Sequence, residues 1–235
     1  MELKTVKTHI DGLDEELGGG ILKGHVVLVS GTPGTMKSSS ILYMMYQNNI
    51  RHGARCLYLS LEERKESLQT TMDRLGMTGY DPEKFSIVDI ARLRMEKEGV
   101  EEKKDWFQII KKFIQRRVES EGVDFIAIDS LTALYTLTEL SNPRLQIFHF
   151  FGFLKELGVN VFLISEMDMD SQAYGNYKED FLADGTFLLH YHEQHDTSVQ
   201  LRMRIVKMRH ANHYRGQMAL MHRNGKLMVA PIVAD

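Results

Sequence analysis

Short, almost continuously apolar runs alternate with longer amphipathic stretches through the first two thirds of the chain. Such runs, without regular polar alternation, are typical of strands that are covered on both faces. The predicted strands are 26–30, 56–60, 125–129 and 159–165, with a weaker fifth at 85–90, and the predicted helices are 37–51, 63–75, 104–119 and 143–157. This alternation predicts an α/β fold with a mainly parallel central sheet flanked by helices.

The pattern changes after residue 185, where short strands follow one another with only turns between them. The predicted strands are 186–190, 199–206, 217–220 and 226–229, and Asn224-Gly225 supplies one hairpin turn. They predict a C-terminal antiparallel β extension. No linker rich in Pro, Gly or Ser separates this extension from the α/β part, so we expect residues 1–235 to form a single domain.

Composition narrows the class of protein. The 235 residues carry 29 Lys and Arg against 32 Asp and Glu, and this net charge of −3 argues against a broad surface for nucleic acid. The single Cys56 cannot form an intrachain disulfide, and the first twelve residues lack the apolar core of a secretion signal. No apolar run reaches the roughly 18 residues that a membrane helix needs. We therefore expect a cytoplasmic protein without a membrane span.

The strand at 26–30 leads into a glycine-containing turn and then into Lys-Ser at the start of a helix. The residues of this segment are Gly31, Thr32, Pro33, Gly34, Thr35, Met36, Lys37, Ser38 and Ser39. The spacing predicts a phosphate-binding P-loop, whose backbone amides and helix N-terminus face phosphate. Lys37 would neutralise the β and γ phosphates, and Ser38 would ligate Mg²⁺. The alternative is a strand-turn-helix unit that binds nothing.

Met36 departs from the P-loop pattern, which has glycine at this position. We expect this residue at positive φ, where a side chain costs about 1 to 2 kcal/mol. Its amide can still point at phosphate, and Gly34 leaves freedom in the loop backbone. The loop is therefore predicted to be strained but able to bind nucleotide.

Three carboxylates follow two of the predicted strands. Asp129 ends the strand at 125–129, as in a Walker B motif, where it could hold Mg²⁺ through water. Glu62 and Glu63 follow the strand at 56–60, and either could activate or orient the attacking water as a general base. The alternatives are a commonplace Asp at a strand end and two acids that favour the N-terminus of the next helix. The sequence does not separate Glu62 from Glu63.

With these motifs in place, the chain resembles the single-domain KaiC-like ATPases of the RecA superfamily, an archaeal-type family related to RadA. The resemblance covers nearly the whole chain and rests on residues 8–14, 18–21, 24, 59–63, 128–134, 181–185 and 206–213. It implies a RecA-like P-loop core that binds ATP and Mg²⁺. It also implies a homo-oligomeric ring, expected to be a hexamer, with nucleotide between neighbouring subunits. The choice of ATP over GTP is implied by the resemblance alone.

The resemblance also assigns a role to the segment 206–213. Lys207 and Arg209 are two residues apart and share one face of a strand. The resemblance implies that they, together with His213, reach the γ-phosphate of a neighbour's nucleotide. The alternative is a pair of solvated basic residues on an exposed strand. His210 departs from the family, which often has glycine after Lys-x-Arg.

Three features stay outside the predicted site. Segment 190–196 holds three His and two carboxylates, but its place between two predicted strands fits a hairpin end better than a metal site. Glu166 follows the strand at 159–165, where related ATPases often have a phosphate sensor, and we do not assign it that role. Basic residues recur on and just before the amphipathic helix at 104–119, where a solvated face explains them; they are Lys103, Lys104, Lys111, Lys112, Arg116 and Arg117.

The predicted function is that of a Mg²⁺-dependent ATPase that hydrolyses ATP slowly as a regulatory switch. Lys37 and one of Glu62 and Glu63 would be catalytic. One alternative is a nucleotide-sensing module with little or no hydrolysis, because Met36 distorts the loop. Another is a RecA or RadA-type recombinase paralogue acting on DNA, although the core begins by about residue 8 and leaves no room for an additional DNA-binding domain. Nothing in the sequence indicates which protein partner it has.

Overall fold

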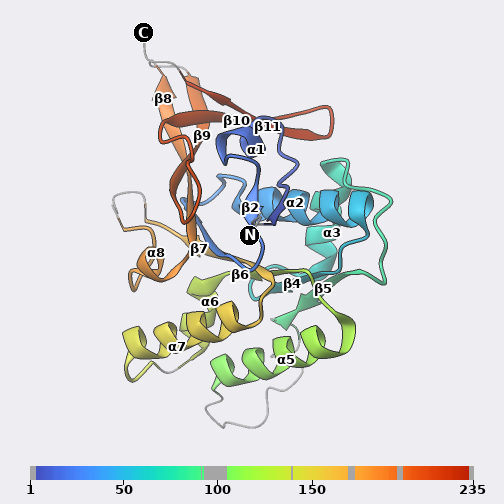
Figure 1. Cartoon of the computed structure of the whole chain (residues 1–235), viewed down its shortest axis with the longest axis vertical. Helices are drawn as coiled ribbons and strands as arrows, with labels where there is room; N and C mark the ends of the chain where they lie inside the picture. The colour runs from blue at the N-terminus through green and yellow to red at the C-terminus, as the bar shows by residue number, and fades with distance from the viewer. Residues whose placement is uncertain are drawn as a thin grey trace.

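The computed structural model describes residues 4–90, 92, 105–138, 140–168, 173–194 and 198–232. Within these ranges a nine-stranded mixed sheet runs in the order β11-β10-β9-β8-β3-β7-β6-β4-β5 (Figure 1). Its parallel part comprises β3 (Val26–Gly31), β4 (Cys56–Ser60), β5 (Phe85–Asp89), β6 (Phe125–Asp129), β7 (Asn160–Glu166) and β8 (Gly185–Gln194). The predicted α/β fold is confirmed.

Helices cover both faces of this sheet. One face carries α2 (Lys37–His52) and α3 (Lys65–Arg74), and the other carries α5 (Trp106–Glu121), α6 (Leu131–Leu137) and α7 (Pro143–Glu156) (Figure 1). Alternate residues of the strands enter two apolar layers, so that Val27 and Val29 face one layer and Val26 and Leu28 face the other. Every residue of β3 is buried, which is why this strand reads as continuously apolar.

The C-terminal strands extend the same sheet. β8 pairs in parallel with β3 and antiparallel with β9 (Ser198–Met208), and β10 (Gln217–Arg223) and β11 (Lys226–Pro231) follow as antiparallel hairpin partners. The β8–β9 arm is longer than predicted, because polar residues continue the ladder beyond the apolar runs. The hairpin end proposed within 190–196 falls partly on residues 195–197, which lie outside the described ranges.

Several short elements were not predicted. They are α1 (Leu13–Glu16), α6, α8 (Glu179–Leu182) and the small sheet of β1 (Thr5–Val6) and β2 (Ile21–Leu22). α6 follows β6 directly and begins at Ser130, whose Oγ accepts a hydrogen bond from the Ala133 amide at 3.2 Å. Because the apolar pattern continues from β6 into α6, periodicity alone does not mark this boundary.

The parallel strands set the geometry of the site. Their carboxyl ends lie at one edge of the sheet, where β3 leads into α2 and β6 leads into α6. Their amino ends lie at the opposite edge, where Asp184 pairs with the start of β3. No helix among the described residues is long and apolar enough to cross a lipid bilayer.

Candidate nucleotide site

The loop between β3 and α2 is folded tightly around one backbone carbonyl. Thr35 Oγ1 donates a hydrogen bond to the Thr32 oxygen at 2.7 Å, and Lys37 Nζ donates to the same oxygen at 2.9 Å. Met36 has a φ of 62°, the left-handed value expected for this position, and its side chain does not cap α2. The amides in the first turn of α2 are therefore available to an anion.

Strand β8 supports this loop from the side. Gly31 lies so close to β8 that a Cβ atom on it would stand 2.2 Å from the Leu189 carbonyl oxygen, so no larger residue fits without movement. Farther along β8, the Tyr191 hydroxyl donates to the Gly34 carbonyl at 2.8 Å. Sequence reasoning missed Tyr191, because it is 157 residues away from Gly34 along the chain.

A cavity of about 350 Å³ lies between the loop and the carboxyl ends of the parallel strands. It is lined by Pro33, Gly34, Thr35, Met36, Lys37, Ser38, Ser39, Glu62, Glu63, Asp129, Ile164 and Glu166. The structure thus brings most of the predicted loop residues together with all three predicted carboxylates. It also adds Glu166, which lies outside the predicted site. Glu166 reaches the cavity because β7 pairs in parallel with β3 and ends with Glu166 opposite Gly31.

Lys37 is the cation of this cavity. Its side chain is buried, and burial lowers the pKa of its ammonium group, while the negative charges of Glu166, Asp129 and Glu62 act in the opposite direction. The surrounding carboxylates therefore offset part of the cost of removing this charge from water. A positive side chain held inside a cavity is suited to meeting phosphate oxygens.

Asp129 and Ser38, the two predicted metal ligands, lie together at the cavity. Burial raises the pKa of Asp129, and the charges of Glu62 and Glu63 raise it further, whereas hydrogen bonds from Tyr58 and Ser38 lower it. Hydroxyl and carboxylate oxygens are the ligand types that Mg²⁺ prefers. The residues present therefore fit this ion.

Glu62 and Glu63 differ in their partners. Glu62 Oε1 accepts a hydrogen bond from Ser130 Oγ at 2.7 Å, which holds it beside Asp129 at the end of β6. Glu63 Oε1 instead accepts from Ser67 Oγ at 2.5 Å, on the first turn of α3. The structure thus separates two residues that the sequence leaves equivalent, and Glu62 is the one held at the end of β6.

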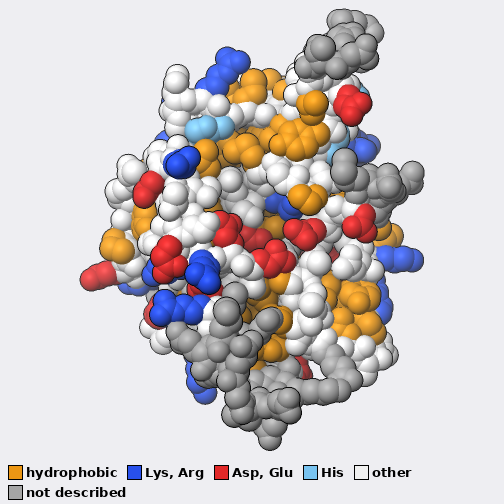
Figure 2. Space-filling model, turned by 180° about the vertical axis from the view of Figure 1, so that it is seen from behind, with side chains coloured by type: hydrophobic (Ala, Val, Ile, Leu, Met, Phe, Trp, Pro, Cys, Tyr) orange, Lys and Arg blue, Asp and Glu red, His pale blue; other side chains and the backbone are white. Residues whose placement is uncertain are grey.

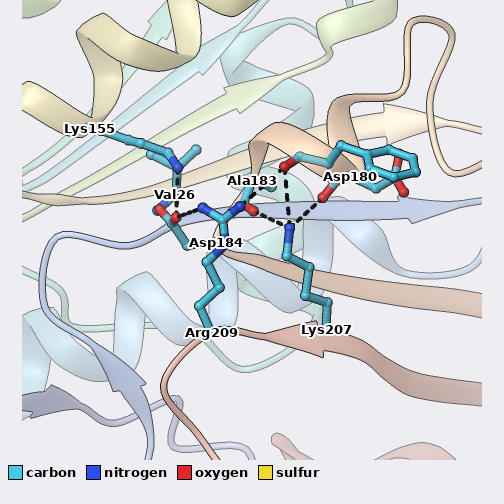
Figure 3. Close-up of polar contacts among 8 residues, drawn as sticks. Val26, Lys155, Asp180, Ala183, Asp184, Lys207 and Arg209 are labelled. Atoms are coloured by element: carbon cyan, nitrogen blue, oxygen red, sulfur yellow. Dashed lines mark hydrogen bonds and ion pairs between the residues drawn. The ribbon is translucent and has the colours of Figure 1, made fainter.

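Lys207 and Arg209 lie at the amino ends of the parallel strands, beside the start of β8 and opposite the end of β3 that leads into the loop. Figure 3 shows their contacts. Lys207 Nζ donates to the carbonyl oxygens of Ala183 at 2.6 Å and Asp180 at 2.8 Å. Arg209 donates to Asp184 Oδ1 at 2.9 Å. The two side chains point toward the same segment, as expected from their spacing, but the oxygens they meet belong to their own chain.

Asp184 is the centre of a cluster at the amino ends of the parallel strands, which also contains Lys155, Lys207 and Arg209 and is called the amino-end cluster below. Its carboxylate also accepts from Lys155 Nζ at 2.7 Å and from the Val26 amide at 3.1 Å (Figure 3). Burial acts to raise the pKa of Asp184, but the hydrogen bonds from Lys155 and the Val26 amide, with the Lys155 charge, hold it below its ordinary value. The carboxylate is therefore charged at neutral pH and joins α7, β3 and the end of β9.

The remaining predicted residues of this segment lie between β9 and β10. His213 Nδ1 is 2.9 Å from the Tyr214 carbonyl oxygen. His210, which stands where the family often has glycine, has a φ of 61° and so keeps a glycine-like backbone conformation. Like Met36, it shows that this chain places side chains at two positions where the backbone favours glycine.

The surface is consistent with the charge balance of the sequence. Seen from behind in Figure 2, acidic side chains gather across the middle of the molecule, and most of the Lys and Arg side chains lie toward the margins. Over the residues described, this face therefore lacks the broad basic surface that is typical of nucleic-acid-binding proteins.

A family model described as "ATPase: KaiC" matches residues 6–231, and the chain belongs to this KaiC family of ATPases. Curated relatives include a UPF0273 protein of Thermotoga maritima, 29% identical over 90% of this chain and 89% of the relative. A UPF0273 protein of Aeropyrum pernix is also 29% identical, over 88% of this chain and 86% of the relative.

A solved structure has the same fold. The KaiC-like protein PH0186 of Pyrococcus horikoshii superposes with a TM-score of 0.81 and 24% identity, covering 98% of this chain and 100% of that chain. The family model confirms the resemblance to KaiC-like ATPases, and this structure confirms the fold.

Proposed function

We propose that this protein binds ATP with Mg²⁺ in the cavity described above and hydrolyses it slowly, as a regulatory switch. The observation that carries the proposal is the convergence of Lys37, Ser38, Asp129 and Glu62 on one cavity at the N-terminus of α2. A helix N-terminus and a buried cation suit the phosphates, and the acids suit a metal ion and a water molecule. Membership of an ATPase family supports the same conclusion.

The reaction is an in-line attack of water on the γ-phosphoryl group. A bond forms between the water oxygen and phosphorus, the bond from phosphorus to the bridging oxygen of ADP breaks, and a water proton passes to Glu62. Lys37 and the loop amides stabilise the charge on the transferred group. Ser38 and Asp129 would hold Mg²⁺, which supplies positive charge to the β and γ phosphates when bound.

We also propose that the active unit is a homo-oligomeric ring, a hexamer, with nucleotide between subunits. Lys207, Arg209 and His213 of one copy would then face the γ-phosphate held by its neighbour. The position of Lys207 and Arg209 supports this arrangement, because they lie at the amino ends of the parallel strands, whereas the loop follows the carboxyl end of β3. In one chain alone these cations cannot reach the phosphates that the chain itself binds.

The assignment of Glu62 as the base gives the direct test. We expect Glu62→Gln to lower the rate of Mg²⁺-ATP hydrolysis about 10²- to 10³-fold without weakening ATP binding, and Glu63→Gln to have a smaller effect. Both changes are isosteric and remove one charge, so each controls for the other. Phosphate release and ATP affinity should be measured on the same preparations, with the oligomeric mass recorded with and without nucleotide.

Three results would contradict the proposal in different ways. Equal rates in both variants and the wild type would leave Glu62 without a catalytic role. Tight binding with no turnover in the wild type would favour the nucleotide-sensing alternative. Stimulation of hydrolysis by single-stranded DNA, together with salt-sensitive DNA binding, would favour the recombinase alternative.

A further inference from the structure

Tyr58 is a buried tyrosine in β4, between β6 and the edge strand β5, and its hydroxyl group is aimed at the candidate site. It lies in β4 opposite Ala127 of β6, and Asp129 is two residues farther along β6 on the same face. A tyrosine is long enough to reach this diagonal neighbour. Its hydroxyl donates a hydrogen bond to Asp129 Oδ2.

Packing alone does not explain why residue 58 carries a hydroxyl group. The Tyr58 side chain is fully buried within the apolar layer beneath α2, where a phenylalanine ring would fill the same space. A buried hydroxyl is costly unless it is hydrogen-bonded, and its partners here are the Asp129 carboxylate and Ser38 of α2. The hydrogen bond therefore restricts the rotation of Asp129 from inside the protein.

We propose that Tyr58 is a positioning residue for Mg²⁺, holding the Asp129 carboxylate toward Ser38 so that the metal site is formed before nucleotide arrives. β4 supplies the tyrosine, β6 the carboxylate and α2 the serine, so three separate elements meet at this point. Groups that orient a metal-binding side chain act on metal affinity without touching the ion. This inference rests on the proposed Mg²⁺-ATP site.

The test compares Tyr58→Phe with Tyr46→Phe. Tyr46, on α2, also donates its hydroxyl to a fixed acceptor, the Thr78 carbonyl at 2.9 Å, but Tyr46 does not line the cavity. Each variant is loaded with ADP, and the affinity for Mn²⁺ is measured by electron paramagnetic resonance. We expect Tyr58→Phe to lower metal affinity about 10-fold, and Tyr46→Phe to leave it unchanged. ADP affinity in EDTA should stay unchanged in both variants.

The outcomes separate this inference from the proposed function. If the wild type binds Mn²⁺ with ADP and Tyr58→Phe binds it equally well, the positioning role is wrong and the site stands. If the wild type does not bind metal with nucleotide, both proposals fail.

Two further variants test whether Tyr58 acts through the carboxylate. They are Asp129→Asn and the double variant that combines Asp129→Asn with Tyr58→Phe. Because Tyr58 is argued to act through Asp129, its substitution should have no further effect on metal affinity once the carboxylate is gone. Additive losses would show that Tyr58 does not act through Asp129, and would overturn the inference.

Discussion

At the carboxyl ends of the parallel strands several carboxylates surround one lysine, whereas at the amino ends several cations surround one aspartate. Lys37 faces Asp129, Glu62 and Glu166, and Asp184 binds Lys155 and Arg209. β3 joins the two clusters, and its six residues separate them by roughly 20 Å.

The difference shows what each cluster lacks. A bound triphosphate would add negative charge to a cavity that is already lined by four acids and a single lysine. The amino end has the opposite excess, because Lys155, Lys207 and Arg209 gather around Asp184, with Asp180 as a second acid near Lys207. Two copies placed end to end would therefore complement each other electrostatically. This is the physical argument for a nucleotide held between subunits.

Mixing two inactive variants is the strongest test of that comparison. We expect Lys37→Ala to weaken ATP binding by about 100-fold or more, and Arg209→Ala to leave binding intact but lower hydrolysis about 10³-fold. In mixed rings some interfaces combine an intact P-loop from one variant with an intact Arg209 from the other. About a quarter of the wild-type rate should then return if subunits mix at random.

Lys226→Ala is the control for the loss of a basic side chain. It changes an exposed lysine on β11 and should remain fully active. If the two inactive variants form mixed assemblies and no activity returns, Arg209 does not act across an interface. The intrachain hydrogen bond with Asp184 would then be its whole role.

Asp184→Asn tests the amino-end cluster as a structural element. We expect the free energy of unfolding to fall by about 1 to 3 kcal/mol at neutral pH, because Lys155 and Arg209 lose a charged partner. The folded pKa of Asp184 lies below its ordinary value of 3.8, so its stabilising contribution is present above that value and is lost as the pH falls through the folded pKa. The difference between variant and wild type should therefore shrink below about pH 4.

Urea unfolding at several pH values measures this difference. Asp81→Asn is the matched control, since its pair with Lys84 at 3.5 Å is solvent-exposed and should contribute little. A difference that stays constant down to pH 2 would contradict the assignment of the effect to the Asp184 charge.

Met36→Gly should have the smallest effect. Glycine relieves the left-handed strain but increases the freedom of the unfolded chain, so stability should change by less than about 1 kcal/mol. We expect hydrolysis to rise by less than about 3-fold, because Met36 already holds the left-handed conformation. Thermal unfolding and phosphate release measure the two quantities. A rise of about 10-fold or more would show that Met36 restrains turnover, as the sensing alternative requires.

Much of the fold could be predicted because its signals are local. Buried parallel strands are continuously apolar, and glycines such as Gly53 and Gly122 end the helices in left-handed conformations. α6 was missed because the apolar pattern of β6 continues into it, and a single N-cap at Ser130 marks the boundary. The β8–β9 arm is longer than predicted because strand pairing, and not apolar content, maintains its polar end.

The candidate site likewise has one part that the local sequence predicts and another that only packing brings together. The P-loop is contiguous, so its residues and the left-handed φ of Met36 could be read from spacing. The distinction between Glu62 and Glu63 depends on Ser130 and Ser67, which only the packing of β6 and α3 brings within hydrogen-bond distance. Tyr58 has no sequence signal at all, since a buried tyrosine in a strand looks like any core aromatic.

By itself, then, the sequence determined the order of elements, the candidate phosphate loop and the acids at the strand ends, because backbone propensity and burial act over a few neighbouring residues. The tertiary structure decided which side chains meet: Tyr58 with Asp129, Ser130 with Glu62, and Arg209 with Asp184. The members of each pair are at least 25 residues apart in the chain. Contacts of that kind depend on which distant strands lie side by side in the sheet, which no local pattern encodes.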